Sequence, residues 1–390
     1  MQQMFENLYS KFRRITSNES YFPEIDGIRF LAICLVILFH THGYFIGKTL
    51  IEFKDNPNAY SLLNVVLLNG DKGVPLFFVL SGFILCLPFA KQYLANGKRI
   101  ELKKYYLRRV TRLEPPYFIA MIFLFLAMLL MKVNTLQQLV PSLLASLIYS
   151  HGIIFHRSPL ITVVAWSLEI EIQFYILAPL LFKLLKLNVL PRRLLLILGT
   201  IGFIICQHYY KPPFENLFTN IQYFLMGILI ADFYVCDYAS RLLKQKWVAL
   251  VAIVLLIGIL YLPIKTTIDK NTIYNEAQFY AILIFPFVIG LFYYIILKNE
   301  ILKKIFSYKF IPVIGGMCYS IYLLHYSIIS FFGRFTIGIK ITDYYLPNLL
   351  FQIIILSIPV LLISGVFYFY IERPFMSKKW TEKLLGKKKI

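Results

Sequence analysis

An arginine and a histidine lie in one apolar run near the start of the chain, and both can do chemistry. The run extends from Ile25 to His40, with Arg29 close to its beginning. On a helix, this spacing places Arg29 and His40 about 16 Å apart and within about 20° of one face. Ionisable groups at membrane depth cost roughly 2.5–3.5 kcal/mol, so each is a candidate functional residue. An ordinary alternative stays open: a snorkelling arginine, and a histidine bonded to a carbonyl inside the bundle.

The composition is that of a helical membrane protein. Of the 390 residues, 59% are hydrophobic and 15% are charged, whereas soluble domains are nearer 45–50% apolar and about 25% charged. The net charge is +20, and the basic residues lie in short loops. This distribution is a signal of membrane orientation and gives no reason to expect a nucleic acid partner. We therefore expect an all-α, polytopic membrane helical bundle surrounded by lipid.

The apolar runs long enough to cross about 30 Å of hydrocarbon number about ten. They lie near 28–47, 73–93, 116–132, 165–185, 194–210, 217–236, 247–264, 277–297, 310–333 and 347–370. With the N-terminus inside, 29 of the 40 lysines and arginines fall in inside segments, ten in outside segments, and Arg29 in the first span. Because positive charge is retained inside, we predict about ten transmembrane helices with both termini in the cytoplasm.

The predicted organisation has three parts and one ambiguous stretch. A cytoplasmic N-terminal segment covers 1–24, the membrane domain 25–375, and a basic cytoplasmic tail 376–390. The stretch 136–155 is almost apolar enough for an eleventh span, but counting it would put the basic tail outside. We place it as an interfacial or re-entrant helix on the outer face, and the sequence leaves these two alternatives open.

Two arginines precede the third span on its cytoplasmic side. Arg109 and Arg112 are three residues apart and so share a helix face, on which two guanidinium forks can clamp a phosphate. The alternative is plain positive-inside charge. Because Arg29 enters the membrane from the same side, all three arginines can converge on one polyanion.

Two glutamates, Glu169 and Glu171, lie in the fourth span just after Trp166 and Ser167. Carboxylates within a membrane run are costly unless they are satisfied, so at least one is expected to be functional. Because they are two residues apart, they do not share a helix face. We expect at most one to face the stripe of Arg29 and His40, and the other to face the outer water.

Two further spans carry weaker signals. In the second span, Ser81 and Gly82 fall near mid-depth, where small residues let helices pack closely. In the ninth span, His325 follows Tyr319, and such a histidine alone is more often structural than catalytic. No metal is expected, because His40 and the histidine two residues later lie on different helix faces.

Taken together, ordered motifs between residues 24 and 375 resemble those of the acyltransferase family 3, bacterial integral-membrane O-acyltransferases that decorate surface glycans. The motifs are Arg29-x10-His40, the run Gly-Val-Pro-Leu-Phe-Phe-Val-Leu-Ser-Gly-Phe at 73–83, Arg109-x-x-Arg112 before Pro115, Trp166-Ser167-Leu168-x-x-Glu171-x-x-Phe174-Tyr175, Tyr322-Leu323-Leu324-His325 and Ile371-Glu372-Arg373-Pro374. Each alone is weak, but the ordered set is specific. The resemblance also selects Glu171 over Glu169.

The resemblance implies roles for particular residues. His40 and Glu171 are expected to be catalytic, and Arg29, Arg109 and Arg112 to bind the donor, acetyl-CoA or another acyl-CoA. Supporting roles are expected for Asp26, Ser81, Trp166, Ser167, Tyr175, Tyr319, His325, Glu372 and Arg373.

The implied function is transfer of an acyl group, expected to be acetyl, from cytoplasmic acyl-CoA across the membrane to a hydroxyl of a surface or exported glycan. The implied location is the bacterial cytoplasmic (inner) membrane. Many family members carry an additional SGNH-type esterase domain. This sequence stops at a basic tail, so that second stage is expected to be absent or supplied by a separate extracytoplasmic transferase. The alternative function is a membrane transporter or flippase for a glycan or an acyl group.

Overall fold

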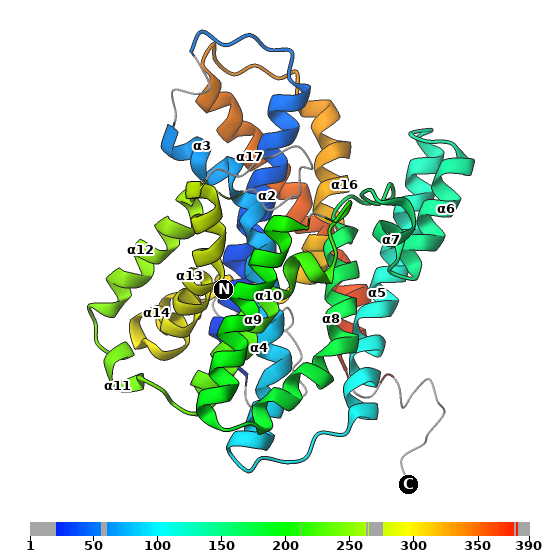
Figure 1. The fold of residues 1–390 in the computed structure, drawn as a ribbon. Helices are drawn as coiled ribbons and strands as arrows, with labels where there is room; N and C mark the ends of the chain where they lie inside the picture. Colours follow the sequence, from blue (N-terminus) through cyan, green and yellow to red (C-terminus); the bar gives the residue numbers. More distant parts are fainter. Residues whose placement is uncertain are drawn as a thin grey trace, which may run out of the picture.

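The computed structural model of the chain describes residues 21–55, 61–210, 212–262, 264, 276–377 and 380. Within these ranges every regular element is a helix, which confirms the all-α class (Figure 1). Nearly all of the predicted segment 1–24 and most of the predicted tail 376–390 lie outside the described residues.

Each predicted span overlaps a helix or a helix pair. These elements are α2 (Pro23–Lys48), α4 (Gly73–Leu94), α5 (Leu102–Leu130), α8 (Ala165–Leu181), α9 (Val189–Tyr209), α10 (Leu217–Val235), α12 (Val248–Tyr261), α13 (Glu276–Lys298), the pair α15 (Phe310–Gly316) and α16 (Cys318–Thr336), and α17 (Tyr345–Phe367). Among the described residues, seven helices are long and apolar enough to cross a membrane, or eight if the bent pair counts as one span. The chain is thus a multi-pass membrane protein, while the exact number of ten stays a prediction.

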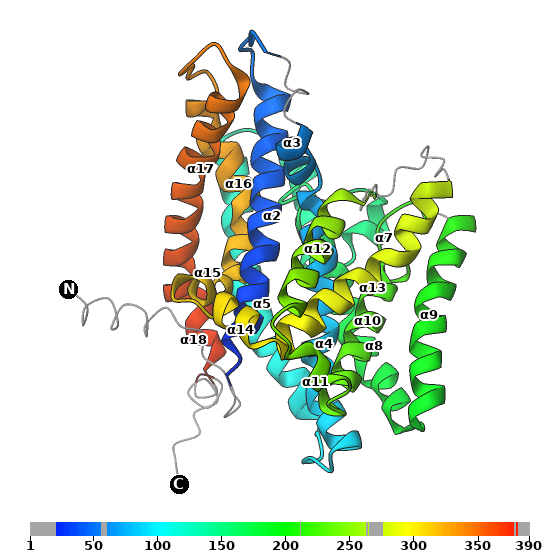
Figure 2. The same ribbon diagram turned by 90° about the vertical axis from the view of Figure 1, so that its left-hand side faces the viewer.

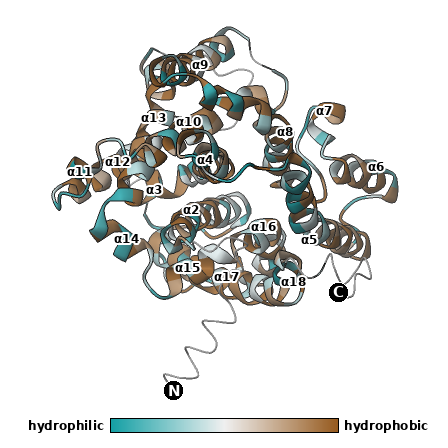
Figure 3. Cartoon of the chain, turned by 90° about the horizontal axis from the view of Figure 1, so that it is seen from below, coloured by the Kyte–Doolittle hydropathy of each residue, from teal (hydrophilic) through white to brown (hydrophobic). Residues whose placement is uncertain are grey.

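Shorter elements connect these helices. They are α3 (Ser61–Leu68), η2 (Gly70–Lys72), α6 (Leu136–Leu147), α7 (His151–Phe155), η3 (Phe182–Lys186), α11 (Ser240–Leu243), α14 (Glu300–Phe306), the π-helical turn η4 (Tyr368–Glu372) and α18 (Arg373–Met376). Figures 1 and 2 show the long helices standing side by side, with the α4–α5 connection at one end of the bundle and the α2–α3 and α16–α17 connections at the other. Seen along the bundle, brown hydrophobic segments are abundant on the outer helices such as α6, α9 and α12 (Figure 3), as expected for surfaces that face lipid.

The predicted orientation can be tested with two introduced cysteines in a cysteine-free background. Glu52 lies beyond α2 and Lys98 lies between α4 and α5, and both are exposed. We expect a membrane-impermeant maleimide to label Glu52→Cys on intact cells and Lys98→Cys only after permeabilisation. Labelling of Lys98→Cys alone on intact cells would reverse the orientation.

Glycines of α4 and α10 make a close helix crossing. A Cβ added at Gly82 would lie 2.5 Å from the carbonyl oxygen of Phe224, and one at Gly227 would meet the carbonyl of Val79 even more closely. Larger residues at Gly82 or Gly227 would therefore push the two backbones apart. This confirms the expectation that the small residues beside Ser81 permit close packing.

The ninth predicted span is broken. α15 and α16 meet at an angle of 73°, so the apolar run predicted as a span at 310–333 is a bent pair of helices. The break follows Gly315 and Gly316, where glycine weakens the helix. A Cβ on Gly315 would collide with the carbonyl of Asp26, so α15 lies directly on the first turn of α2.

The stretch 136–155 forms a helical hairpin of α6 and α7. Its inner end packs on α5, where the Tyr117 hydroxyl donates to the Ser146 carbonyl at 2.9 Å and the Tyr149 hydroxyl donates to Glu114 at 3.1 Å. Glu114 is about 24 Å along α5 from its end at Leu130. The stretch therefore packs lengthwise on α5, and its assignment as interfacial or re-entrant stays a prediction.

Candidate active site

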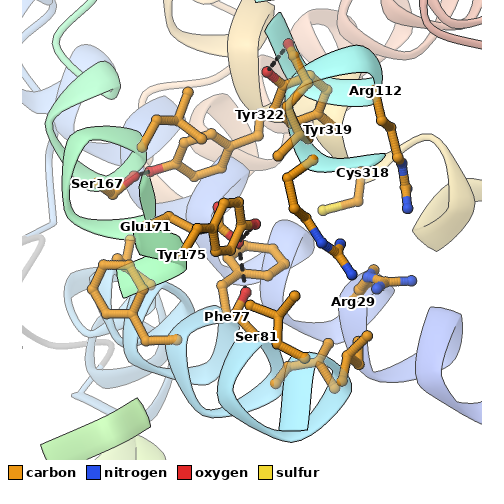
Figure 4. A pocket seen from close by; sticks show the side chains of 18 of the residues that line it. Arg29, Phe77, Ser81, Arg112, Ser167, Glu171, Tyr175, Cys318, Tyr319 and Tyr322 are labelled. Atoms are coloured by element: carbon orange, nitrogen blue, oxygen red, sulfur yellow. Dashed lines mark hydrogen bonds between the residues drawn. The ribbon is translucent and has the colours of Figure 1, made fainter. Parts of the chain in front are cut away.

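A pocket opens between α2, α4, α5, α8 and the broken pair α15–α16 (Figure 4). It encloses about 900 Å³, including its opening to the outside. Most of the residues predicted from the sequence line it: Arg29, Ser81, Arg109, Arg112, Ser167, Glu171, Tyr175, Tyr319 and Glu372. Residues from distant parts of the sequence thus converge on one cavity.

One side of the pocket is basic. Arg29 and Arg112 lie on the same side in Figure 4, across from Ser167 and Glu171. The spacing prediction for the pair on α5 holds, since Arg109 and Arg112 are both helical and both line the pocket. Arg29 also forms an ion pair with Asp26, which is 2% exposed, so the predicted supporting residue Asp26 holds this arginine from outside the pocket lining.

Arg109 has an unsatisfied donor. Its Nε atom is buried and has no hydrogen-bond partner among the described residues. Its guanidinium carbon lies 5.9 Å and 5.8 Å from the ring centroids of Tyr105 and Tyr175, so the flat side chain is held beside two aromatic rings. A buried donor left unpaired typically costs about 1–3 kcal/mol, and an anionic ligand in the pocket would satisfy it.

The carboxylate of Glu171 faces the pocket from α8. It accepts hydrogen bonds from Ser81 Oγ at 2.6 Å and from the Tyr175 hydroxyl. Ser167, Glu171 and Tyr175 are spaced four residues apart and form one stripe on α8. Ser81 lies about 20 Å along α4 from Leu94, so this polar group is near mid-depth.

Glu169 points away from the pocket and does not face the outer water, so that part of the sequence prediction is wrong. The side chain is 4% exposed and accepts hydrogen bonds from the backbone amides of His151 at 3.1 Å and Gly152 at 2.9 Å. The physical reason is the hairpin at 136–155, whose helix α7 begins against α8. Glu169 satisfies the free amides at the start of α7.

This structural assignment of Glu169 predicts a loss of stability on substitution. We expect Glu169→Ala to lower the apparent melting temperature in detergent by about 2–5 °C, since it leaves two buried amides unpaired. Glu169→Gln keeps a carbonyl acceptor, so its melting temperature should lie between those of Glu169→Ala and the unchanged protein. An unchanged melting temperature for Glu169→Ala would contradict the assignment.

Tyr319 and Glu372 hold the start of α16 at the pocket. The Tyr319 hydroxyl donates to the Leu113 carbonyl at 2.9 Å. Glu372 is 1% exposed and accepts from the Ser320 backbone amide at 3.0 Å and from the Ser320 hydroxyl. A carboxylate is stabilised at a helix N-terminus, so Glu372 fixes the break between α15 and α16.

His40 is not among the residues that line the pocket. Its ring packs on α16, with centroid distances of 5.1 Å to both His325 and Tyr326. Arg29 and His40 do point to the same side of α2, as their spacing predicts, because Arg29 lines the pocket with the start of α16. A series of ring contacts links the pocket to His40: Tyr322 lies 5.7 Å from His325, which contacts His40.

Two other predicted residues also lie outside the pocket lining. The ring of Trp166 packs at 6.5 Å against Phe78, which itself lines the pocket. The guanidinium of Arg373 lies 5.9 Å from the ring of Phe369. Both residues contact the framework of the site and do not contribute to the lining.

Two lining residues of consequence stand in the sequence motifs but were not predicted as site residues. Tyr322 lines the pocket and shares a 2.5 Å hydrogen bond between its hydroxyl and Ser167 Oγ. Phe77 also lines the pocket, with its ring 5.9 Å from that of Tyr322. A signal for Tyr322 was present, since it is one helical turn before His325 and one after Tyr319.

Comparisons with known proteins agree with this architecture. The sequence profile of the acyltransferase domain family matches residues 22–369. The O-acetyltransferase OatA of Staphylococcus aureus strain NCTC 8325 is 24% identical over 391 residues, covering 94% of this chain. A putative O-acetyltransferase of S. aureus strain COL is also 24% identical, over 393 residues. The chain spans 59% and 58% of the lengths of these relatives, and no solved structure matches it.

Proposed function

From the premise that this chain belongs to the acyltransferase family 3, we propose that it transfers an acyl group from a cytoplasmic acyl-CoA across the membrane to a hydroxyl of a surface or exported glycan. The observation that carries the proposal is the pocket, which three arginines line together with Glu171. The named activity of its relatives, O-acetyl transfer, makes acetyl-CoA the first donor to test. The proposed location is the bacterial cytoplasmic membrane.

The arginines suit the phosphates of the donor. Guanidinium groups bind phosphate through paired, charge-assisted hydrogen bonds, and the buried Nε of Arg109 has no partner among the described residues. These groups lie toward the end of the bundle predicted to be cytoplasmic. The pantetheine arm of the donor is long and flexible, so it can carry the thioester deeper, past Glu171 and toward Tyr322.

The proposed step joins the donor to an acceptor hydroxyl. An unprotonated nitrogen of His40 takes the proton of that hydroxyl while the hydroxyl oxygen bonds to the acyl carbon. The C–S bond of the thioester breaks, its electron pair stays on sulfur, and the proton then passes to sulfur to give the free thiol. Transient attachment of the acyl group to the imidazole is the other route, and it needs the same nitrogen.

In this scheme Glu171 fixes the positions of polar side chains in the pocket. Its carboxylate is held by the hydroxyls of Ser81 and Tyr175 and so keeps a fixed position in the pocket. The ring of His40 is separated from it by Tyr322 and His325. The Tyr322 ring thus lies between the pocket and the histidine pair, and its hydroxyl is held by Ser167.

The test measures acyl transfer directly. Purified protein in liposomes, supplied with radiolabelled acetyl-CoA on one side and cell-surface polysaccharide on the other, should transfer label to the polysaccharide. In cells, deleting the gene should remove the mass increment of one acyl group per modified sugar. The rival function, a transporter or flippase, predicts altered glycan export with unchanged acylation, and that outcome would overturn the proposal.

A further inference from the structure

Two histidine rings from different helices meet beyond the pocket. The centroids of His40 on α2 and His325 on α16 are 5.1 Å apart, with an angle of 47° between the rings. Imidazoles at this separation can form a hydrogen bond between ring nitrogens when those nitrogens point toward each other. The pocket lining assigned above does not use this pair.

The backbone around His325 fixes which of its nitrogens carries hydrogen. The Nδ1 atom lies 3.1 Å from the Ile321 carbonyl oxygen and 2.9 Å from the Tyr322 carbonyl oxygen. Carbonyl oxygens only accept hydrogen bonds, so Nδ1 must be the donor. In the neutral ring, Nε2 therefore holds the lone pair.

This Nε2 atom is a buried acceptor without a partner. The His325 side chain is 0% exposed, and its Nε2 makes no hydrogen bond to any described residue. The hydroxyl of nearby Tyr322 does not supply one, because it is engaged with Ser167 Oγ at 2.5 Å and the Val164 carbonyl at 3.3 Å. A buried acceptor left unpaired calls for an explanation, and the imidazole packed beside it is that of His40.

We infer that His325 is a positioning residue for His40: its Nε2 lone pair accepts the N–H of His40. This hydrogen bond fixes the tautomer of His40, so that the lone pair sits on the other nitrogen of that ring. The inference rests on the proposed function, in which that lone pair takes the proton of the acceptor hydroxyl or attacks the acyl group. When His40 gains a proton, the same hydrogen bond stabilises the resulting imidazolium.

Three substitutions of His325 separate this role from simple packing. The side chain of glutamine can place a carbonyl oxygen, an acceptor, at the position of Nε2. The shorter side chain of asparagine can place a polar group only at the position of Nδ1. Leucine provides no polar group at either position. We expect His325→Leu and His325→Asn to lower kcat on the order of 100-fold, the upper end of losses for removing a partner that orients a histidine. The KM for acyl-CoA should stay within about twofold, because His325 does not line the donor pocket. His325→Gln should recover at least about tenfold over His325→Leu.

Equal activity of His325→Gln and His325→Leu would overturn the inference, as would full activity of His325→Leu. If His40→Ala retains activity, the proposed function of His40 fails instead, so the two failures are distinguishable.

A second measurement needs no substrate. The chain has six histidines, so the ring nitrogens of ¹⁵N-histidine-labelled protein in detergent micelles can be assigned by substitution. We expect the unprotonated Nε2 of His325 to show the shift of a hydrogen-bonded lone pair, and to move toward the free value in His40→Ala. An unchanged His325 resonance in His40→Ala would overturn the inference even if acyl transfer is confirmed.

Discussion

His40→Ala is expected to abolish acyl transfer while the protein remains folded and inserted. A positioned general base contributes about 10²–10⁴-fold to a rate, and alanine removes the only nitrogen lone pair assigned to that task. The donor site should be unaffected, since the ring of His40 is separated from the pocket by Tyr322 and His325. The measurement is kcat for label transfer in liposomes, together with the Kd for acetyl-CoA.

A matched control lies two residues further on the same helix. His42 is 2% exposed and its Nε2 lies 2.9 Å from the Tyr345 hydroxyl, so it joins α2 to α17 and does not approach His325. His42→Gln should keep kcat within a few-fold of the unchanged protein. Retained activity in His40→Ala, with normal amounts of protein in the membrane, would remove this histidine from the mechanism.

Of the arginine substitutions on α5, the double substitution of Arg109 and Arg112 is expected to weaken donor binding most. A hydrogen bond to a charged group is worth about 1.5–3 kcal/mol, so Arg109→Ala alone should raise the Kd for acetyl-CoA by roughly 10–150-fold. The pair Arg109→Ala and Arg112→Ala should raise it by about 10²–10⁴-fold, less any coupling between the neighbours. The Kd of Arg109→Lys should lie between those of the unchanged protein and Arg109→Ala, because lysine keeps the positive charge and loses the paired N–H donors of the guanidinium.

The neighbouring Arg108 supplies the control. It has the same side chain on the same helix, but it is exposed and does not line the pocket. Arg108→Ala should leave the Kd within about twofold. If Arg108→Ala weakened donor binding as much as Arg109→Ala, general positive charge at this end of the bundle would explain the binding and the clamp would be refuted.

The sequence by itself was sufficient for the helical framework and for most of the pocket. Hydropathy and charge are local properties, so apolar runs and basic loops can be read along the chain. The three-residue spacing of Arg109 and Arg112 sets their shared face on any helix. The ordered motifs contain Ser81, Glu171 and Tyr175, and in the structure Ser81 and Tyr175 both donate hydrogen bonds to Glu171.

Tertiary structure decided the features that depend on contacts between distant segments. The packing of the stretch 136–155 along α5 is known only from contacts such as that of Tyr149 with Glu114. That hairpin in turn buries Glu169, which sequence reasoning placed toward water. The break between α15 and α16 depends on where Gly315 meets α2, and hydropathy does not encode such a meeting.

The position of His40 was likewise determined partly by the sequence and partly by tertiary packing. Its spacing from Arg29 correctly gave the side of α2 from which both side chains project, because helical periodicity is set by the backbone alone. Whether the ring would border the pocket or lie beyond it, against His325, depended on how α16 packs across α2. That packing results from many weak contacts between helices far apart in sequence, and no single stretch of the chain specifies it.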